Sequence, residues 1–229
     1  MSLMSEAFHP GDVEKVASDI IADTEVGHAL RRKYSRKLKV ASPVFVLELA
    51  RLLFRTHGQR WLACELIRHH DKAFSNIGER EVEEFGQDIN SWGSVDQFAR
   101  SLAGPAWLAG RISDALVHRW ACSEDRWWRR AALVSTVALN VRSHGGKGDV
   151  KRTLQVCRLL VGDNDDMVFK ALSWALRALV VHNPEKVSEF LNKYENVLAA
   201  QVKREVRNKL TTGLKNPKKK VGDKRFKKT

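Results

Sequence analysis

The chain has 229 residues, of which 43% are apolar, 29% are charged and five are proline, and its formal net charge is +13. This composition predicts one soluble domain with a large core and excludes a chain that is disordered throughout. The longest uncharged apolar tract near the middle of the chain, residues 131–141, is far shorter than the roughly 20 residues that span a bilayer, so no membrane segment is expected.

The first residues, 1–12, contain acidic side chains and lack a basic stretch followed by an apolar core. We therefore expect no secretory signal and a cytoplasmic location. The three cysteines are isolated and odd in number, which predicts small buried apolar groups rather than a disulfide or a zinc site. They are Cys64, Cys122 and Cys157.

Metal binding is not expected either. His69 and His70 are neighbours, and side chains at i and i+1 of a helix point about 100° apart. No second histidine or carboxylate follows at the spacing that ligands of one metal require. The sequence thus predicts no metal site.

Apolar residues along the body recur at intervals of three and four, and alternating β-branched strands are absent, so an all-α fold is predicted. Ser42-Pro43 and Asn183-Pro184 predict helix starts, because Ser or Asn supplies an acceptor and Pro needs no donor there. Gly104-Pro105 is interpreted as a break of the same kind. Further breaks near Gly27, Gly58, 76–78, Ser91, Ser123, 145–148 and 163–166 give about twelve helices of roughly ten to nineteen residues.

A series of helices joined by short loops buries its apolar stripes either as a compact bundle or as stacked pairs. So many helices favour stacking, and no strict repeat motif is visible, so degenerate HEAT-like pairs of about 35 to 45 residues are predicted. The expected architecture is a curved solenoid of about six such pairs over residues 1–214, with a concave basic face that suits a duplex.

The C-terminal segment, residues 215–229, has eight Lys or Arg and one Asp, and so carries +7 of the net charge. Its Pro, Gly and low hydrophobicity predict a flexible basic tail. Two roles stay open for it. One is nonspecific attraction to nucleic acid by counterion release, and the other is a solubilising extension with no specific function.

An arginine cluster begins the helix that is predicted over residues 124–142. Arg126 and Arg130 lie four residues apart, at the end of the helix where its dipole favours acidic side chains. We therefore interpret both as ligands of an external anion, and phosphate fits because a guanidinium binds it through two hydrogen bonds. The alternative is a local ion-pair network with Glu124 and Asp125. The packing face of this helix is predicted to comprise Trp127, Ala131, Val134, Ala138 and Val141.

Trp174 lies opposite the apolar stripe of its own helix, between Lys170 and Arg177. An aromatic ring in the middle of a basic face is typical of nucleic-acid contact, so Lys170 and Arg177 are candidate DNA-binding residues. The alternative is that Trp174 packs against the next helix pair. The apolar stripe comprises Val168, Leu172, Ala175 and Leu179.

Trp92 and Asp96 are four residues apart and so project from neighbouring positions of one helix. Val95 and Phe98 belong to the buried stripe of this helix, with Trp92 at its border and Asp96 outside it. An aromatic ring beside a carboxylate suits a positively charged centre such as a sugar cation. The alternative is an ordinary solvated or capping Asp. The other tryptophans are assigned mainly to packing: Trp61, Trp107, Trp120, Trp127 and Trp128.

Four tracts of the chain occur in the order expected for one known family. The sequence resembles the AlkD-type family of DNA alkylation-repair glycosylases, from about Lys33 to Pro217. The tracts are SWGSVDQFA (91–99), WACSEDRWWRRAALVSTVALNVR (120–142), DDMVFKALSWALRALV (165–180) and KREVRNKLTTGLKNP (203–217).

The resemblance implies a HEAT-like solenoid that hydrolyses the N-glycosidic bond of cationic alkylpurines, N3-methyladenine and N7-methylguanine, in duplex DNA. It implies that Asp96 is the catalytic carboxylate, that Trp92 and Trp174 contact the sugar of the lesion, and that Arg130 contacts a backbone phosphate. Arg177 is a further phosphate candidate. The resemblance also implies that no base-flipping pocket and no cofactor are needed. A monomer is expected.

Two departures from the family pattern leave an alternative function open. Ala178 stands where many relatives have Glu, so an orienting acid is either absent or supplied from elsewhere in the chain. The first forty residues match poorly. Some relatives lack glycosylase activity and bind branched or distorted DNA, which is the alternative function, and a helical-repeat protein scaffold is the third hypothesis.

Overall fold

The structure is a computed structural model that describes residues 8–217. Every regular element within this range is a helix and no strand occurs in it, so the all-α prediction is confirmed. Residues 218–229, which are most of the predicted basic tail, lie outside the described residues. The domain boundary after residue 214 stays a prediction.

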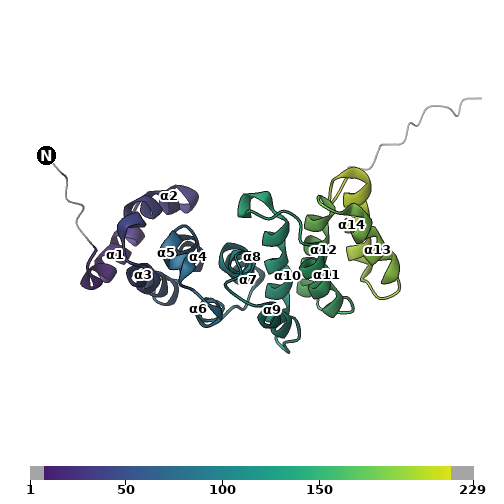
Figure 1. The fold of residues 1–229 in the computed structure, drawn as a ribbon, viewed down its shortest axis with the longest axis horizontal. Helices are drawn as coiled ribbons and strands as arrows, with labels where there is room; N and C mark the ends of the chain where they lie inside the picture. Colours follow the sequence, from purple (N-terminus) through teal and green to yellow (C-terminus); the bar gives the residue numbers. More distant parts are fainter. Residues whose placement is uncertain (1–7, 218–229) are drawn as a thin grey trace, which may run out of the picture.

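The N-terminal part of the molecule consists of short helices (Figure 1). They are η1 (Pro10–Asp12), α1 (Val13–Ala22), α2 (Gly27–Lys37), η2 (Leu38–Val40), α3 (Pro43–Arg55), α4 (Arg60–Arg68), α5 (Asp71–Ser75) and α6 (Glu79–Phe85).

The remaining part contains the two longest helices, α10 and α12. Its elements are α7 (Trp92–Phe98), η3 (Ala99–Ala103), α8 (Gly104–Leu108), α9 (Asp114–Ala121), α10 (Arg126–Asn140), η4 (Arg142–His144), α11 (Val150–Leu159), α12 (Asp166–Val180), α13 (Pro184–Lys193) and α14 (Ala200–Thr212).

The helix starts predicted from capping residues are confirmed. The Ser42 hydroxyl accepts a hydrogen bond from the backbone N–H of Phe45 at 3.1 Å, and α3 begins at the proline after Ser42. The Asn183 side chain accepts from the N–H of Lys186 at 2.9 Å and begins α13 in the same way. Ser91 caps α7 and so fixes where the helix that carries Trp92 starts.

The break predicted at Gly104-Pro105 is wrong. The chain stays helical from α7 into α8, because η3 is a π-helical segment in which the N–H of Gly104 donates to the carbonyl of Ala99, five residues earlier. Gly104 keeps helical angles, φ −62° and ψ −47°, although a proline follows it. A residue before proline usually avoids this region because of its Cβ, which glycine lacks. The helices of the described residues are therefore more numerous and shorter than predicted, fourteen α-helices of five to fifteen residues.

The helices follow one another along the long axis of the molecule (Figure 1). One series, α2, α4, α7, α10, α12 and α14, makes consecutive contacts along this axis. Helices α3, α9, α11 and α13 pack against members of that series, so neighbours in the chain are neighbours in space. The core is thus built mainly from contacts between helices that are close to one another in the sequence.

Helix α10 is the centre of this arrangement. The sequence predicts a single packing stripe for it, which is incomplete, because all residues from Arg130 to Asn140 are buried. Helices α7, α8 and α9 cover it on one part of its surface, and α11 and α12 contact it elsewhere. Such all-round burial explains why residues 131–139 carry no charge.

Helices α8 and α10 cross closely at Gly104, and a methyl group there is expected to destabilise the fold. A Cβ at this position would lie 2.7 Å from the Cβ of Ala138 and 2.7 Å from the carbonyl oxygen of Ser135. We expect Gly104→Ala to lower the free energy of unfolding by about 2 kcal/mol, measured by urea denaturation. The control is Gly93→Ala, because a Cβ on this helical glycine meets nothing within 4 Å. Equal stability of the two variants would contradict the close crossing.

The cysteines only partly match their prediction. Cys64 and Cys157 are buried, and burial raises the pKa of the Cys64 thiol to about 12, so this thiol is protonated and unreactive at neutral pH. Cys122 is exposed at the C-terminal end of α9, and its predicted burial is wrong. None of the helices between residues 8 and 217 has both the length and the apolarity needed to cross a membrane.

Candidate functional site

A cleft of about 800 Å³ brings together three of the residues that the sequence singles out, Trp92, Asp96 and Trp174. One of its walls comes from α7, η3 and α12, and the other comes from α2 and α4. Residues 143 and 144 of the segment after α10 complete the lining. The cleft is lined by His28, Arg31, Trp61, Glu65, Arg68, His69, Trp92, Gly93, Asp96, Gln97, Arg100, Ser101, Ser143, His144 and Trp174.

The two indoles present different surfaces to the cleft. Trp92 is the first residue of α7 and is 62% exposed, so its ring is available to a ligand. Trp174 lies in the middle of α12 and is partly buried, with part of its ring packed against the core. The ring of Trp174 therefore packs against the core and also lines the cleft, and its contact with nucleic acid stays a prediction.

Asp96 forms a bidentate ion pair with Arg130. Nε of Arg130 donates to one carboxylate oxygen at 3.0 Å and Nη2 donates to the other at 2.9 Å. Nη1 of Arg130 donates to the carbonyl of Met167 at 2.7 Å. One guanidinium therefore links α7, α10 and the start of α12, and it fixes the orientation of the Asp96 carboxylate.

The electrostatics of Asp96 combine two opposed effects. Burial raises the pKa of its carboxyl group above the ordinary value of 3.8, although the hydrogen bonds and charge of Arg130, with Arg100 beyond it, act in the opposite direction. The Asp96 side chain is still 20% exposed toward the cleft. A carboxylate that is fixed and partly desolvated interacts more strongly with a nearby cation than one in water does.

Arg130 lies behind Asp96 and not on an open surface. Its side chain is 7% exposed, and all three of its guanidinium nitrogens donate to groups of the protein. The phosphate contact that the sequence predicts for Arg130 requires an exposed guanidinium. The structure instead places this residue where it supports the carboxylate.

Arg126 and Lys170, the other predicted phosphate contacts on these helices, are exposed but do not line the cleft. Nη1 of Arg126 lies 3.3 Å from Asp165, and Nζ of Lys170 lies 2.6 Å from Asp166. Each cation is therefore paired with an acid at the start of α12. Surface pairs of this kind contribute little stability, so both groups can exchange the acid for another anion at small cost.

The local ion-pair network with Glu124 and Asp125, the alternative to an external anion, is wrong in its partners, and Glu124 contributes its backbone carbonyl, which accepts from Nη1 of Arg129 at 2.7 Å. Asp125 caps α10 by accepting the N–H of Trp127 at 2.8 Å. The acids that pair with the arginines come from the loop before α12 instead, since Nε of Arg129 donates to Asp163 at 2.7 Å. This pairing spans 34 positions of the chain and is not visible in local sequence.

Arg177 faces α14 and is only 17% exposed. Its Nε donates to the Ser173 hydroxyl at 3.2 Å and lies 3.8 Å from Glu205, which is buried and also accepts a hydrogen bond from Ser173 at 2.6 Å. Burial lowers the pKa of Arg177, and the Glu205 carboxylate opposes that effect. An acid therefore lies beside Arg177 although position 178 is Ala, and α14 supplies it.

The wall contributed by α2 and α4 contains site residues that the sequence did not indicate. Glu65 is buried there, with Nη1 of Arg68 at 3.1 Å and Nε of Arg31 at 3.8 Å. Trp61, which the sequence assigns to packing, both packs against the core and lines the cleft. Arg100 was detectable in principle, because it lies four residues after Asp96, whereas Arg31 and Arg68 reach the cleft only through tertiary packing.

His144 adds an uncharged hydrogen-bonding group to the cleft. Burial lowers the pKa of its imidazole to about 4, and the charges of Arg68 and Arg100, and of His69 when it is protonated, act in the same direction. Its Nδ1 is buried without a hydrogen-bond partner. The ring is therefore neutral at physiological pH.

Comparison with protein families finds one that matches most of the chain. The model of the family described as DNA alkylation repair enzyme matches residues 24–210, a span that contains every residue of the cleft. Comparison with the curated proteins finds no match. Since the matched span covers far more than half of the chain, the protein belongs to the AlkD-type family of DNA alkylation repair enzymes.

Proposed function

We propose that the protein is a monofunctional DNA glycosylase that removes cationic alkylpurines, such as N3-methyladenine and N7-methylguanine, from double-stranded DNA. The observation that carries this proposal is the meeting of Trp92, Asp96 and Trp174 in one cleft. A fixed carboxylate with indole rings in the same cleft suits a sugar that becomes positively charged.

The reaction is hydrolysis of the bond between C1′ of the deoxyribose and the purine nitrogen. The bond breaks with its electron pair going to the purine, which neutralises the positive charge of the alkylated base. The sugar becomes an oxocarbenium-like cation, and water adds to C1′ and gives up one proton, which the Asp96 carboxylate accepts. Asp96 stabilises the cation and accepts a hydrogen bond from the attacking water, while the faces of Trp92 and Trp174 hold the sugar.

Arg130 is a positioning residue in this proposal. Its two hydrogen bonds, at 3.0 and 2.9 Å, use one acceptor site on each oxygen of Asp96 and hold the carboxylate in one orientation. The exposed part of the carboxylate then faces the cleft, where the substrate and water bind. Because the carboxylate is already oriented before the reaction, no free energy is needed to reorient it as the transition state forms.

We further propose that the helix pairs form a curved HEAT-like solenoid whose basic inner face binds the duplex. The serial contacts of α2, α4, α7, α10, α12 and α14 support this architecture, and Arg31, Arg68 and Arg100 supply positive charge around the cleft. The proposal needs no base-flipping pocket, since the charged lesion is itself a good leaving group. The protein acts as a monomer without a cofactor.

The proposal is tested with methylated duplex DNA. The protein is incubated with it, and released N7-methylguanine and N3-methyladenine are measured by chromatography. Release of both bases above the spontaneous rate is expected. If no base is released at excess protein while branched DNA is bound tightly, the protein is a non-catalytic DNA-structure binder and the proposal fails.

Trp92 gives a separate test of the sugar contact. Because Trp92 is 62% exposed, its replacement is expected to leave the fold intact. We expect Trp92→Ala to slow single-turnover base release by roughly 3- to 30-fold, which corresponds to the loss of one cation–π contact, and Trp92→Phe to retain most of the rate. Equal rates for Trp92→Ala and the unmodified protein would exclude the contact.

A further inference from the structure

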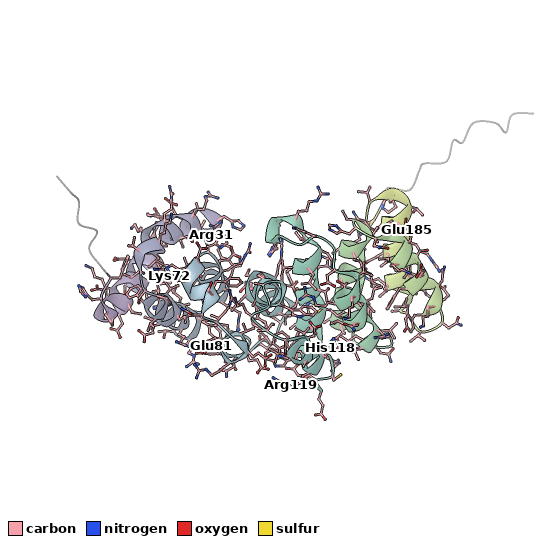
Figure 2. All side chains as sticks on the ribbon, viewed as in Figure 1. Arg31, Lys72, Glu81, His118, Arg119 and Glu185 are labelled. Atoms are coloured by element: carbon pink, nitrogen blue, oxygen red, sulfur yellow. The ribbon has the colours of Figure 1, made fainter. Side chains whose placement is uncertain are left out.

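A second hollow, of about 650 Å³, lies beside the cleft, between α2 and the turn that joins α4 to α5. Arg31 and His69 line both the hollow and the cleft, so the two adjoin. Figure 2 labels Arg31 on α2 and Lys72 on α5, which both line the hollow. It is lined by Arg31, Arg32, Ser35, Arg36, Lys39, His69, His70, Asp71 and Lys72.

The hollow has a surplus of unpaired positive charge. Asp71 is the one acid that the described part of the chain contributes to its lining. Arg31 lies 3.8 Å from Glu65, but among residues 8–217 the other four cations of the lining have no carboxylate within 4 Å. These four are Arg32, Arg36, Lys39 and Lys72. Four unpaired cations around one hollow form a local concentration of positive charge, which suits an anionic ligand.

His70 supplies a hydrogen-bond donor with no partner. The residue is 6% exposed, and its Nδ1 accepts the N–H of Ala73 at 3.0 Å. In the neutral ring the proton therefore lies on Nε2, which is buried and has no hydrogen-bond partner. The hydroxyl of Ser35 and Nε of Arg31 are buried without hydrogen-bond partners as well. Unsatisfied buried donors are uncommon, and an acceptor in the hollow would satisfy them.

We propose that this hollow is a phosphate-binding site. A phosphate group offers several strong acceptors and a negative charge, which match the donors His70, Ser35 and Arg31 and the cations Arg36 and Lys39 around them. The site adjoins the Asp96 cleft and shares Arg31 and His69 with it, and it does not depend on glycosylase activity. Because the two adjoin, a backbone phosphate of DNA in the cleft and a free phosphate compound are the two sources of such a group.

The test is calorimetric titration of the full chain with inorganic phosphate, with chloride at equal ionic strength as the reference. His70→Asn retains an acceptor that caps α5 but lacks the Nε2 donor, and Arg36→Gln removes an exposed charge without affecting the core. We expect each to weaken phosphate binding about tenfold. The matched control is Arg158→Gln on α11, an exposed arginine outside the hollow, which is expected to bind phosphate as the unmodified protein does.

The outcomes separate the alternatives. Absence of phosphate binding, unchanged binding by His70→Asn and Arg36→Gln, or equal weakening by Arg158→Gln would each overturn the site. If undamaged duplex DNA competes with phosphate, the group belongs to the DNA backbone, and Arg36→Gln also lowers the slope of log affinity against log salt by about 1. If DNA does not compete, the site takes a free phosphate compound. Base release from methylated DNA is measured separately, so failure of the glycosylase proposal leaves this result intact.

Discussion

Replacement of Asp96 by Asn is expected to slow release of N7-methylguanine by about 100- to 1000-fold, the range seen when one preorganised electrostatic group is lost from a reaction centre. Asn has nearly the same shape, but it carries no charge to stabilise the sugar cation and cannot accept the proton of water. The measurement is the single-turnover rate on methylated duplex DNA. Binding of undamaged DNA is expected to be unchanged or tighter, because a negative charge has been removed from the cleft.

The control for Asp96→Asn is Asp19→Asn, which removes an exposed carboxylate from α1. This variant is expected to release base at the rate of the unmodified protein. A rate for Asp96→Asn within about threefold of the unmodified protein would exclude Asp96 as the group that carries the chemistry. Loss of DNA binding together with activity would indicate a misfolded cleft instead, and circular dichroism checks for that.

Arg130→Met is expected to lower both stability and activity, because it leaves the Asp96 carboxylate partly buried without its partner. Removing one member of a buried ion pair is strongly destabilising, because the other charge stays buried without a partner. Since the Asp96 side chain is still 20% exposed to water, we expect a smaller loss, about 2–3 kcal/mol in the free energy of unfolding. Urea denaturation at pH 7 measures it. Base release is expected to fall as well, since nothing then orients the carboxylate.

The same variant has a predictable pH dependence. Burial raises the pKa of Asp96 and Arg130 opposes this, so removing Arg130 moves the pKa further above its ordinary value of 3.8. The folded variant then holds a proton that the unfolded chain releases near pH 4, so its stability falls as pH rises from about 4 through the raised pKa. Acidification should therefore restore part of the lost stability. The acid limb of the pH profile, in which base release falls as Asp96 is protonated, should move to higher pH.

Arg130→Lys is the matched control, because it keeps the charge but not the two parallel hydrogen bonds. We expect its stability and its acid limb to lie between those of Arg130→Met and the unmodified protein. If Arg130→Met keeps full stability and an unchanged pH profile, the pair does not hold the carboxylate. Both variants would then be expected to show only weaker DNA binding, as a phosphate contact requires.

Local chemistry accounts for the features that the sequence predicts correctly. A cap such as Ser42 or Asn183 acts on an N–H three residues away, so its effect can be inferred from neighbouring residues. Likewise, helix periodicity shows that Asp96 lies off the packing stripe, because that depends only on residues of its own helix. The family resemblance then indicates that Trp174, 78 positions later, belongs to the same site.

Long-range pairing accounts for what the sequence does not predict. Periodicity shows that Arg130 is beside a packing face, but not that it meets a carboxylate 34 positions earlier. The acid beside Arg177 comes from α14, 28 positions later. The wall with Arg31 and Glu65 depends on how α2 packs against α4, and no pattern within either helix specifies that contact.

The π-helical segment 99–103 also determines which way two distant side chains of one continuous helix point. Trp107 follows Asp96 by 11 positions, which is about three turns of an α-helix, so in an uninterrupted α-helix both would share one face. Instead Asp96 lines the cleft and Trp107 is fully buried, because the wider turn changes the phase between them. Conversion of this segment to a regular α-helix of the same length would place both side chains on one face and so force one of the two out of its place. The backbone form of this segment therefore sets the direction of Asp96 as much as the side chains around it do.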